Sequence, residues 1–438
     1  MEKSGLSFSA FFKSSLPYVV LISVVSLVYI PVAGHDFLYQ WDDQWVVMNH
    51  YTSGGFNWDN ISRIFTDFYH GQYAPLNELN YLFIYAVSGY SPLPFHLVSL
   101  CWHLANVCLV YLFIKKLLSL KYGTGFEGSG LVSFFTALLW GIHPVNVESV
   151  AWLSASKILI YSFFYLLALI SYLEYLSSKR NLFFILTLFF FVCSFGGKEQ
   201  AVTMPVCLLL IDYFLGRDFR DKDLWIEKIS FFSLSLLGGF LTILSQGNGG
   251  GEDLVYSYGY RILFACYALF EYFVKAILPV NLSYLYPFPV LPGEALPIRF
   301  WFYPFIIIFG LAIVFLYRRN RVLVFSVFFL IIHVAVALHI ISLSRFTIVA
   351  DRYIYIGCVG VSFFTIWLVY KAKSYLKPKS FRFIIIFSVS YMLYFGIYSY
   401  LYSQVWKDTD ILKSHIRELL KNREDESLIN VYKGLYDY

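Results

Sequence analysis

Long apolar runs separated by short polar segments recur along the whole chain. The first reads LPYVVLISVVSLVYIPVA and occupies 16–33. A run of about 18 or more apolar residues is long enough to cross a bilayer as one α-helix. We therefore predict eleven membrane spans, at 16–34, 94–114, 131–150, 157–177, 181–196, 200–216, 229–246, 300–317, 322–342, 353–371 and 383–402.

The basic connections between these runs set their orientation. KKLLSLK, SSKRN, RDFRDKDLWIEK, RRNR and KAKSYLKPKSFR alternate with connections that are not basic. Because Lys and Arg concentrate in cytoplasmic loops, these connections are predicted to lie inside, together with the N-terminus. The leading MEKSGLSFSAFFKSSLP is followed by no small-residue cleavage site, so we expect an uncleaved anchor.

The segment YRILFACYALFEYFVKAIL at 260–278 decides the number of predicted membrane spans. It is long enough to span, but a span here would move RRNR and KAKSYLKPKSFR outside, and it carries Arg261, Glu271 and Lys275. We therefore predict an interfacial or re-entrant helix on the outer side. A twelfth span, with its charges facing the bundle, is the alternative.

Composition supports an all-α polytopic membrane protein. Of the 438 residues, 59% are hydrophobic and 14% are charged, and the mean hydropathy is +0.64, whereas soluble domains are about 25% charged. This argues against a large soluble helical protein and makes the lipid bilayer, and not nucleic acid, the expected partner. The six cysteines lie in apolar or amphipathic runs without a CxxC, so we expect small buried side chains instead of disulfides or metal ligands.

The predicted topology places isolated charges on one face. It has a membrane domain at 1–402, with a long first outer loop at about 35–93 and an outer loop carrying the interfacial helix at about 247–299, followed by a short outer tail at 403–438. Nearly all acids outside the tail then fall on the outer face. A site is therefore expected there, whereas charges within the spans would have favoured an ion path.

Four outer segments carry candidate chemistry. LYQWDDQWVVMNH at 38–50 holds the adjacent acids Asp42 and Asp43, which are also typical of a helix N-terminus. HPVNVESVAWLSASK, SFGGKEQAVTMPV and SLSRFTIVADRYIYIGCVG supply His143, Glu148, Lys157, Lys198, Glu199, Arg345, Asp351 and Arg352. Arginine suits a phosphate because the guanidinium fork matches its oxygens. Polar helix ends with snorkelling lysines, and a structural pair between Asp351 and an arginine, are the alternatives.

Seven strings, in chain order, resemble a known family. They are WDDQWVVMN, YAPL, FHLVSLCWHLANV, HPVNVESVAWLSASK, KEQAVTMPVCLLLIDYFL, YRILFACYALFEYFVKAILPVNLSYLYPFP and ADRYIYIGCVG. Together they resemble the membrane half of the transmembrane and tetratricopeptide-repeat protein O-mannosyltransferases and their bacterial relatives, over about 15–410. These proteins belong to the GT-C superfamily. The resemblance implies a GT-C fold and an inverting glycosyltransferase whose sugar donor is carried on a polyprenyl phosphate.

The resemblance also implies a division of roles. Asp42 matches the acid of the first outer loop and becomes the candidate general base. Asp43 would tune the pKa of Asp42, orient the acceptor, or hold Mg²⁺ or Mn²⁺ with it. The donor phosphate is assigned to Arg261, Arg352, Lys198 and Lys157. The sugar or acceptor is assigned to His143, Glu148, Glu199, Asn49 and Tyr353.

Three features depart from the family pattern. Ala74 stands where an arginine is common in the family's YRPL string, and Gly357 stands where a proline usually follows RYxY. The tail at 403–438 has room for roughly one helix, so we expect no 34-residue repeat in it. The acceptor therefore stays open between Ser or Thr of exported proteins and an envelope glycan or glycolipid. The expected location is the bacterial inner membrane, with the site facing the periplasm.

Two other functions stay open. A lipid-linked sugar flippase or transporter is expected to show polar spans and internal repeats, which we do not find. The polar residues of the second predicted span, His96, His103 and Asn106, are explained by packing or by hydrogen bonds between spans. A noncatalytic assembly protein of the same fold would keep its function without the Asp42 carboxylate.

Overall fold

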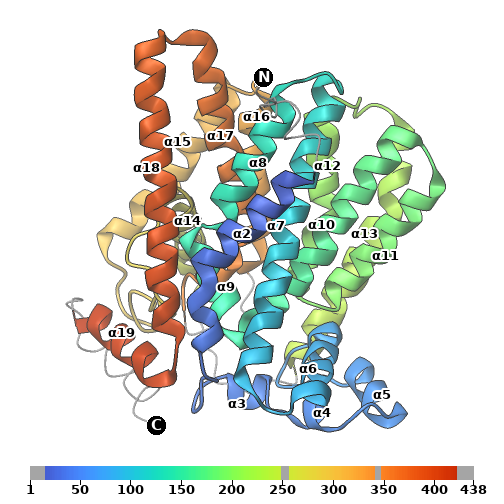
Figure 1. The fold of residues 1–438 in the computed structure, drawn as a ribbon, viewed down its shortest axis with the longest axis vertical. Coiled ribbons are helices and arrows are strands. Elements are labelled where there is room, and N and C mark those ends of the chain that lie inside the picture. The colour runs from blue at the N-terminus through green and yellow to red at the C-terminus, as the bar shows by residue number, and fades with distance from the viewer. Residues whose placement is uncertain (1–14, 248–255, 341–346, 422–438) are drawn as a thin grey trace, which may run out of the picture.

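Helices run side by side through most of the protein (Figure 1). The structure is a computed structural model that describes residues 15–247, 256–340 and 347–421. Its longer helices are α2 (Leu16–Tyr29), α7 (Pro92–Tyr122), α8 (Gly128–Gly141), α10 (Ser156–Ser178), α11 (Asn181–Phe195), α12 (Met204–Leu215), α13 (Lys222–Gly247), α14 (Tyr258–Ile277), α15 (Tyr303–Leu316), α16 (Arg321–Val334), α17 (Cys358–Tyr375) and α18 (Pro378–Ser403). Within the described ranges there is no strand, only an isolated bridge between Tyr69 and Gln72. The predicted all-α class is confirmed.

Short helices occupy the predicted first outer loop. They are α3 (Asp43–Val46), α4 (His50–Ser53), α5 (Trp58–Thr66) and α6 (Pro75–Ser88). In Figure 1 they lie at the bottom of the molecule, as does α19 (Thr409–Lys421), whereas the basic connections from α7 to α8 and from α17 to α18 lie at the top. The basic connections and the first outer loop are thus at opposite ends, as the charge pattern predicts.

Several of the predicted spans correspond to short apolar helices, such as Asn181–Phe195 and Arg321–Ala337. Six described helices are long and apolar enough to cross a membrane, or up to seven if one bent pair counts as a single span. That pair covers the predicted span at 131–150 and is broken at Pro144. Its two parts, Gly128–Gly141 and Pro144–Ala151, meet at 54°, because Pro144 has no backbone N–H and cannot continue a helix. The count of eleven stays a prediction.

The amphipathic segment at 260–278 forms α14, which packs on α15, α16 and α17. Its apolar face, including Phe264, Ala268 and Tyr272, is buried against them. It is not among the helices that are long and apolar enough to span. Whether it lies at the interface or enters the bilayer therefore stays a prediction, but its buried face makes it part of the bundle.

The long helix α7 anchors the bundle through polar contacts. Asn106 Nδ2 donates to the carbonyl oxygen of Leu159 on α10 at 2.9 Å. The two ring nitrogens of His103 hydrogen-bond the Gly141 carbonyl oxygen at 2.9 Å and the Tyr355 hydroxyl at 2.7 Å. These contacts join α7 to α8, α10 and the turn before α17, so the expectation of hydrogen bonds between spans is confirmed.

Close packing also explains one departure from the family pattern. A Cβ atom at Gly357 would lie 3.0 Å from Leu330 Cδ1, and one at Gly360 would lie 2.6 Å from the Ser326 carbonyl oxygen. The first turn of α17 therefore approaches α16 more closely than a larger residue allows. This contact fixes the turn that precedes α17, which carries part of the candidate site.

Candidate active site

Asp42 lies at the start of α3 with its carboxyl partly exposed. It occupies the N-cap position, but its side chain makes no capping hydrogen bond. Burial raises its pKa, while the positive charges of Arg352 and Lys157 and a hydrogen bond from the Trp45 side chain act in the opposite direction. Asp42 is thus half-buried as a residue, and its carboxyl is under the influence of two positive charges.

Asp43 has a different environment. Its side chain is buried, and Oδ2 accepts from the Leu38 backbone N–H at 2.9 Å. Oδ1 accepts from the Ser154 backbone N–H at 3.0 Å and from the Ser154 hydroxyl. Burial raises the pKa of Asp43 to about 6, although the hydrogen bonds from Ser154 and Leu38 act to lower it. The negative charge of Asp42 adds a further small increase. Asp43 thus fastens α3 to the 3₁₀ turn Leu153–Ala155.

These contacts bear on the predicted metal site. The oxygens of Asp43 already accept three hydrogen bonds from Leu38 and Ser154, which leaves Asp42 alone as a carboxylate that could face a metal ion. Over the described ranges, no group of three or more His, Cys, Asp or Glu side chains is placed to hold one. Asp42 is therefore the carboxylate of this pair that could contribute to an Mg²⁺ or Mn²⁺ site shared with phosphate oxygens and water, and no chemistry below is assigned to a metal.

Arg352 is held by a buried ion pair with Glu148. Its Nη1 lies against Glu148 Oε1, and its backbone N–H donates to Glu148 Oε2 at 2.7 Å. The guanidinium also lies over the rings of Trp152 and Tyr353, with 5.2 Å and 4.9 Å to the ring centres. Glu148 comes from α9 (Val147–Ala151) and Arg352 from the 3₁₀ turn Asp351–Ile354. The pair holds the Arg352 charge where it acts electrostatically on Asp42.

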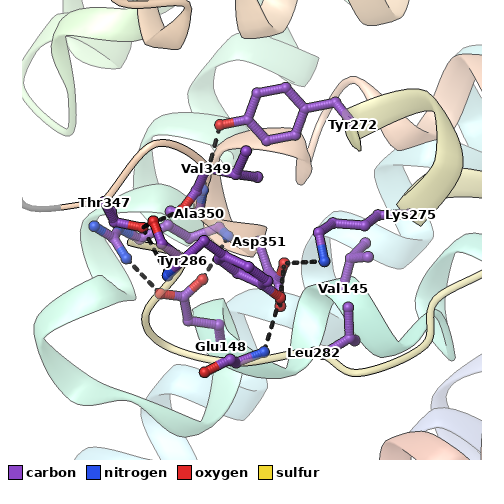
Figure 2. A network of polar contacts seen from close by, with 12 residues as sticks. Val145, Glu148, Tyr272, Lys275, Leu282, Tyr286, Thr347, Val349, Ala350 and Asp351 are labelled. Atoms are coloured by element: carbon purple, nitrogen blue, oxygen red, sulfur yellow. Dashed lines mark hydrogen bonds and ion pairs between the residues drawn. The ribbon is translucent and has the colours of Figure 1, made fainter. Parts of the chain in front are cut away.

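A second network holds the turn that carries Arg352 (Figure 2). The Tyr286 hydroxyl donates to both oxygens of Asp351, at 2.9 and 3.1 Å, and Lys275 Nζ lies 3.9 Å from Asp351 Oδ1. Lys275 also lies over the Tyr286 ring at 4.0 Å. The Thr347 hydroxyl accepts from the Tyr286 backbone N–H at 3.0 Å. The structural pair for Asp351 therefore exists, but its cation is Lys275 on α14.

Lysines from two further segments complete the cluster. Lys198 Nζ lies 3.9 Å from Glu199 Oε1 and 5.0 Å from the centre of the Tyr353 ring. Lys157, at the start of α10, donates to Gln72 Oε1 and interacts with the charges of Lys198, Glu199 and Arg352. The cations Lys157, Lys198 and Arg352 thus converge from three distant segments on the neighbourhood of Asp42. Such a cluster can stabilise an anion next to a general base.

Three predicted site residues have other contacts. Arg261 Nε donates to the Tyr256 carbonyl oxygen at 3.1 Å, and its guanidinium lies over the Tyr258 ring. It precedes Lys275 on α14 by 14 residues, which is about 21 Å along a helix. No described contact joins it to the cluster.

His143 and Asn49 are both helix-capping residues. His143 is buried, its Nδ1 accepts from the Val145 N–H, and its Nε2 donates to the Ala276 carbonyl oxygen at 3.0 Å. Asn49 Oδ1 caps α4, and its Nδ2 donates to Glu78 Oε2 at 2.8 Å. These residues position backbone around the cluster and do not face it with a free polar group. Arg345 lies outside the described residues.

Glu78 is a residue that the sequence reasoning missed. Burial raises its pKa to about 7, although the hydrogen bond from Asn49 and the charge of Lys157 act to lower it. An acid in the first turn of α6, three residues after Pro75, looks like an ordinary partner of the helix dipole. Only the fold shows that it lies near Lys157, together with Ala74, the position where the family pattern has an arginine.

Comparisons with known proteins agree with the resemblance. The chain is 31% identical to Protein O-mannosyl-transferase Tmtc1 of Drosophila melanogaster over 180 residues, which cover 39% of this chain and 20% of that protein. It is 29% identical to TMTC2 of Mus musculus over 180 residues, 40% and 20% of the two chains. Its curated relatives are protein O-mannosyl-transferases.

The coverage of these relatives is partial. Protein O-mannosyl-transferase F38B6.6 of Caenorhabditis elegans is 24% identical over 287 residues, 61% of this chain and 39% of that protein. The chain thus spans between a fifth and two fifths of the length of these relatives. No family model and no solved structure matches it. The relatives confirm the predicted resemblance and agree with the glycosyltransferase class expected from the sequence.

Proposed function

We propose that this protein transfers a sugar from a polyprenyl-phosphate donor to the hydroxyl of a protein acceptor at the outer face of the membrane. Mannose is the sugar that the names of the relatives indicate. The observation that carries the proposal is the position of Asp42 beside Arg352 and Lys157, with Lys198 next to them. One partly exposed acid and three cations are the groups that transfer from a phosphate ester requires.

The reaction follows from these positions. Asp42 takes the proton of the acceptor hydroxyl as its oxygen forms a bond to the anomeric carbon. The bond from that carbon to the phosphate oxygen breaks, and its electron pair leaves with the polyprenyl phosphate. Attack opposite to the leaving group inverts the anomeric configuration. Burial raises the pKa of Asp42 above the usual value of an aspartate, which makes the carboxylate a stronger base while it is ionised.

The other residues support this step. Arg352, Lys157 and Lys198 stabilise the charge that develops on the leaving phosphate, and Glu148 keeps the Arg352 guanidinium in place. Glu199 and Tyr353 lie against these cations and complete the donor side. We assign the phosphate to these three cations in preference to Arg261, because Arg261 is about 21 Å from Lys275 along α14. Asp43 positions α3 and has no proton-transfer role.

The proposal is tested with purified protein in nanodiscs, a polyprenyl-phosphate donor with labelled mannose, and a peptide that contains threonine. Wild type is expected to transfer label, and Asp42→Asn to lose at least a hundredfold in rate, which is the scale of general base catalysis. Asp59→Asn is the matched control, since Asp59 is an exposed acid of the same loop that pairs with Arg63. Equal transfer by wild type and Asp42→Asn would remove Asp42 as the base.

The same assay separates the alternatives. No transfer by wild type to peptide, glycan or glycolipid, together with movement of labelled lipid across the bilayer, would favour a flippase. Transfer to a glycolipid alone would change the proposed acceptor class but would leave the proposed mechanism unchanged. We place the protein in a bacterial inner membrane with the site facing the periplasm, which protease accessibility of a tag inserted in the α4–α5 connection would test in intact spheroplasts.

A further inference from the structure

A pocket opens in the first outer loop next to Asp42. Its walls come from α3, α4, the connection from α5 to α6, α6 itself and the start of α10. Side chains that line it include Trp45, Tyr51, Asp67, Tyr69, Glu78 and Lys157. Apart from Lys157, none of these has a role in the transfer step proposed above.

The pocket shares two side chains with the surroundings of Asp42. Trp45 lines the pocket and lies three residues after Asp42, about one helical turn away, and its side chain acts to lower the pKa of the Asp42 carboxyl. The Lys157 ammonium acts electrostatically on both Asp42 and Glu78. A molecule with its hydroxyl at Asp42 therefore has its neighbouring groups at the pocket. Since the pocket is built by the outer loop, this molecule is the acceptor.

The charges in the pocket are unbalanced. Glu78 accepts a hydrogen bond from Asn49, and Asp67 accepts one from the Tyr51 hydroxyl at 3.2 Å. Neither carboxyl has a cation within ion-pair distance among the residues that the structure describes. Lys157 is the single ammonium in the wall, and it is engaged by Gln72 and by the charges of Asp42 and Glu199. Burial raises the pKa of Glu78 to about 7, and the hydrogen bond from Asn49 and the charge of Lys157 oppose this rise only in part.

The aromatic walls suit the same occupant. Trp45, Tyr51 and Tyr69 line the pocket beside the two carboxyls, and a cation is attracted both to aromatic faces and to carboxylates. A neutral sugar would stack on such rings but would leave the carboxylate charge uncompensated. We propose that this pocket is an acceptor subsite that binds the side chain of a lysine or arginine near the hydroxyl to be glycosylated. The proposal rests on the function proposed above.

The test uses short threonine peptides that differ at one position. Peptides carry lysine, its uncharged analogue norleucine, or glutamate at each of the two positions on either side of the threonine. Transfer is measured as kcat/KM with wild type, Glu78→Gln and the control Asp59→Asn, in nanodiscs. Glutamine keeps an oxygen for Asn49 and removes only the charge. Peptide binding is measured separately, by fluorescence anisotropy of labelled peptides without donor.

At one position, wild type is expected to prefer lysine over norleucine by about tenfold, the size of a partly exposed charge pair at an interface. Glu78→Gln should reduce that preference to less than twofold, and Asp59→Asn should retain it. The subsite would be overturned if wild type showed no preference for lysine over norleucine, or if Glu78→Gln kept that preference unchanged. It would also be overturned if glycans displaced the bound peptide while lysine in the peptide had no effect on binding. If no peptide is glycosylated but lysine-dependent binding still requires Glu78, the proposed transfer fails while the subsite stands.

Discussion

The buried pair of Glu148 and Arg352 gives the sharpest test of how the cluster acts. In Glu148→Gln the shape is kept and one charge is removed. The Glu148 side chain is fully buried and that of Arg352 is 14% exposed, so the guanidinium would lose its partner in a place that water barely reaches. Breaking a buried pair in this way costs about 3–5 kcal/mol. We expect the lower end, since glutamine still accepts from the Arg352 N–H.

The same change should alter chemistry. Without Glu148, the full charge of Arg352 acts on Asp42 and lowers the pKa of that carboxyl, because Arg352 already opposes its rise. Asp42 becomes a weaker base, and Arg352 pairs with it in place of the leaving phosphate. If about 1.4 kcal/mol of the disturbance reaches the transition state, transfer falls tenfold. The acid limb of the pH–rate profile should move to lower pH.

The assay is the nanodisc transfer reaction from pH 4.5 to 8.5, with thermal unfolding of the same samples. Glu174→Gln is the matched control, because Glu174 on α10 is half-buried, pairs with Lys116 on α7 and lies far from the site. It should change neither rate nor pH profile. Glu148→Asp, which keeps the charge, should recover part of the rate. A wild-type rate and an unmoved acid limb in Glu148→Gln would refute the proposed role of the pair.

Three further predictions concern single side chains. Asp43→Ala should lower the thermal unfolding temperature more than Asp42→Ala, because it leaves the buried donors of Leu38 and Ser154 unpaired at about 1–3 kcal/mol each; equal shifts would contradict this. Folding raises the pKa of Glu78 to about 7 from an ordinary value of 4.5, so the folded state binds the extra proton and stability should fall as pH rises from about 4.5 to 7; Glu78→Gln should flatten that slope. Lys275→Met should reduce kcat/KM for the donor, because Lys275 pairs with Asp351. Lys275→Arg should restore most of that kcat/KM. A purely structural role predicts instead a loss of stability, with no recovery of kcat/KM in Lys275→Arg.

Much of the fold could be predicted, because membrane helices are encoded locally. Apolar length alone located the helices, and the basic connections do lie at the end opposite the first outer loop. Pro144 also marked the break between α8 and α9, but the sequence did not show the 54° angle between the two parts. Whether a bent helix counts as one span depends on packing, which a hydropathy pattern does not contain.

The site was predictable only in part. Asp42, Lys157 and Arg352 were expected in one site because each is a charge next to an apolar run, and the charges of Lys157 and Arg352 do act on Asp42. The role of Asp43 depends on Ser154, which is 111 residues away, and that of Asp351 depends on Lys275 and Tyr286. Such partners come from tertiary structure. Arg261 resembled a phosphate ligand in the sequence, yet its contacts lie at the far end of α14.

The contrast between the two adjacent acids has an evolutionary consequence. Position 43 needs side-chain oxygens that accept from the Leu38 N–H and from Ser154, so an asparagine there, with one oxygen, would meet part of the need without any charge. On the proposed mechanism, position 42 needs a proton acceptor. Selection should therefore tolerate a loss of charge at position 43 when stability is gained elsewhere, but at position 42 only in lineages that have given up catalysis. Substitutions at position 43 would then follow changes in the stability of the fold, and substitutions at position 42 would follow the loss or retention of catalysis.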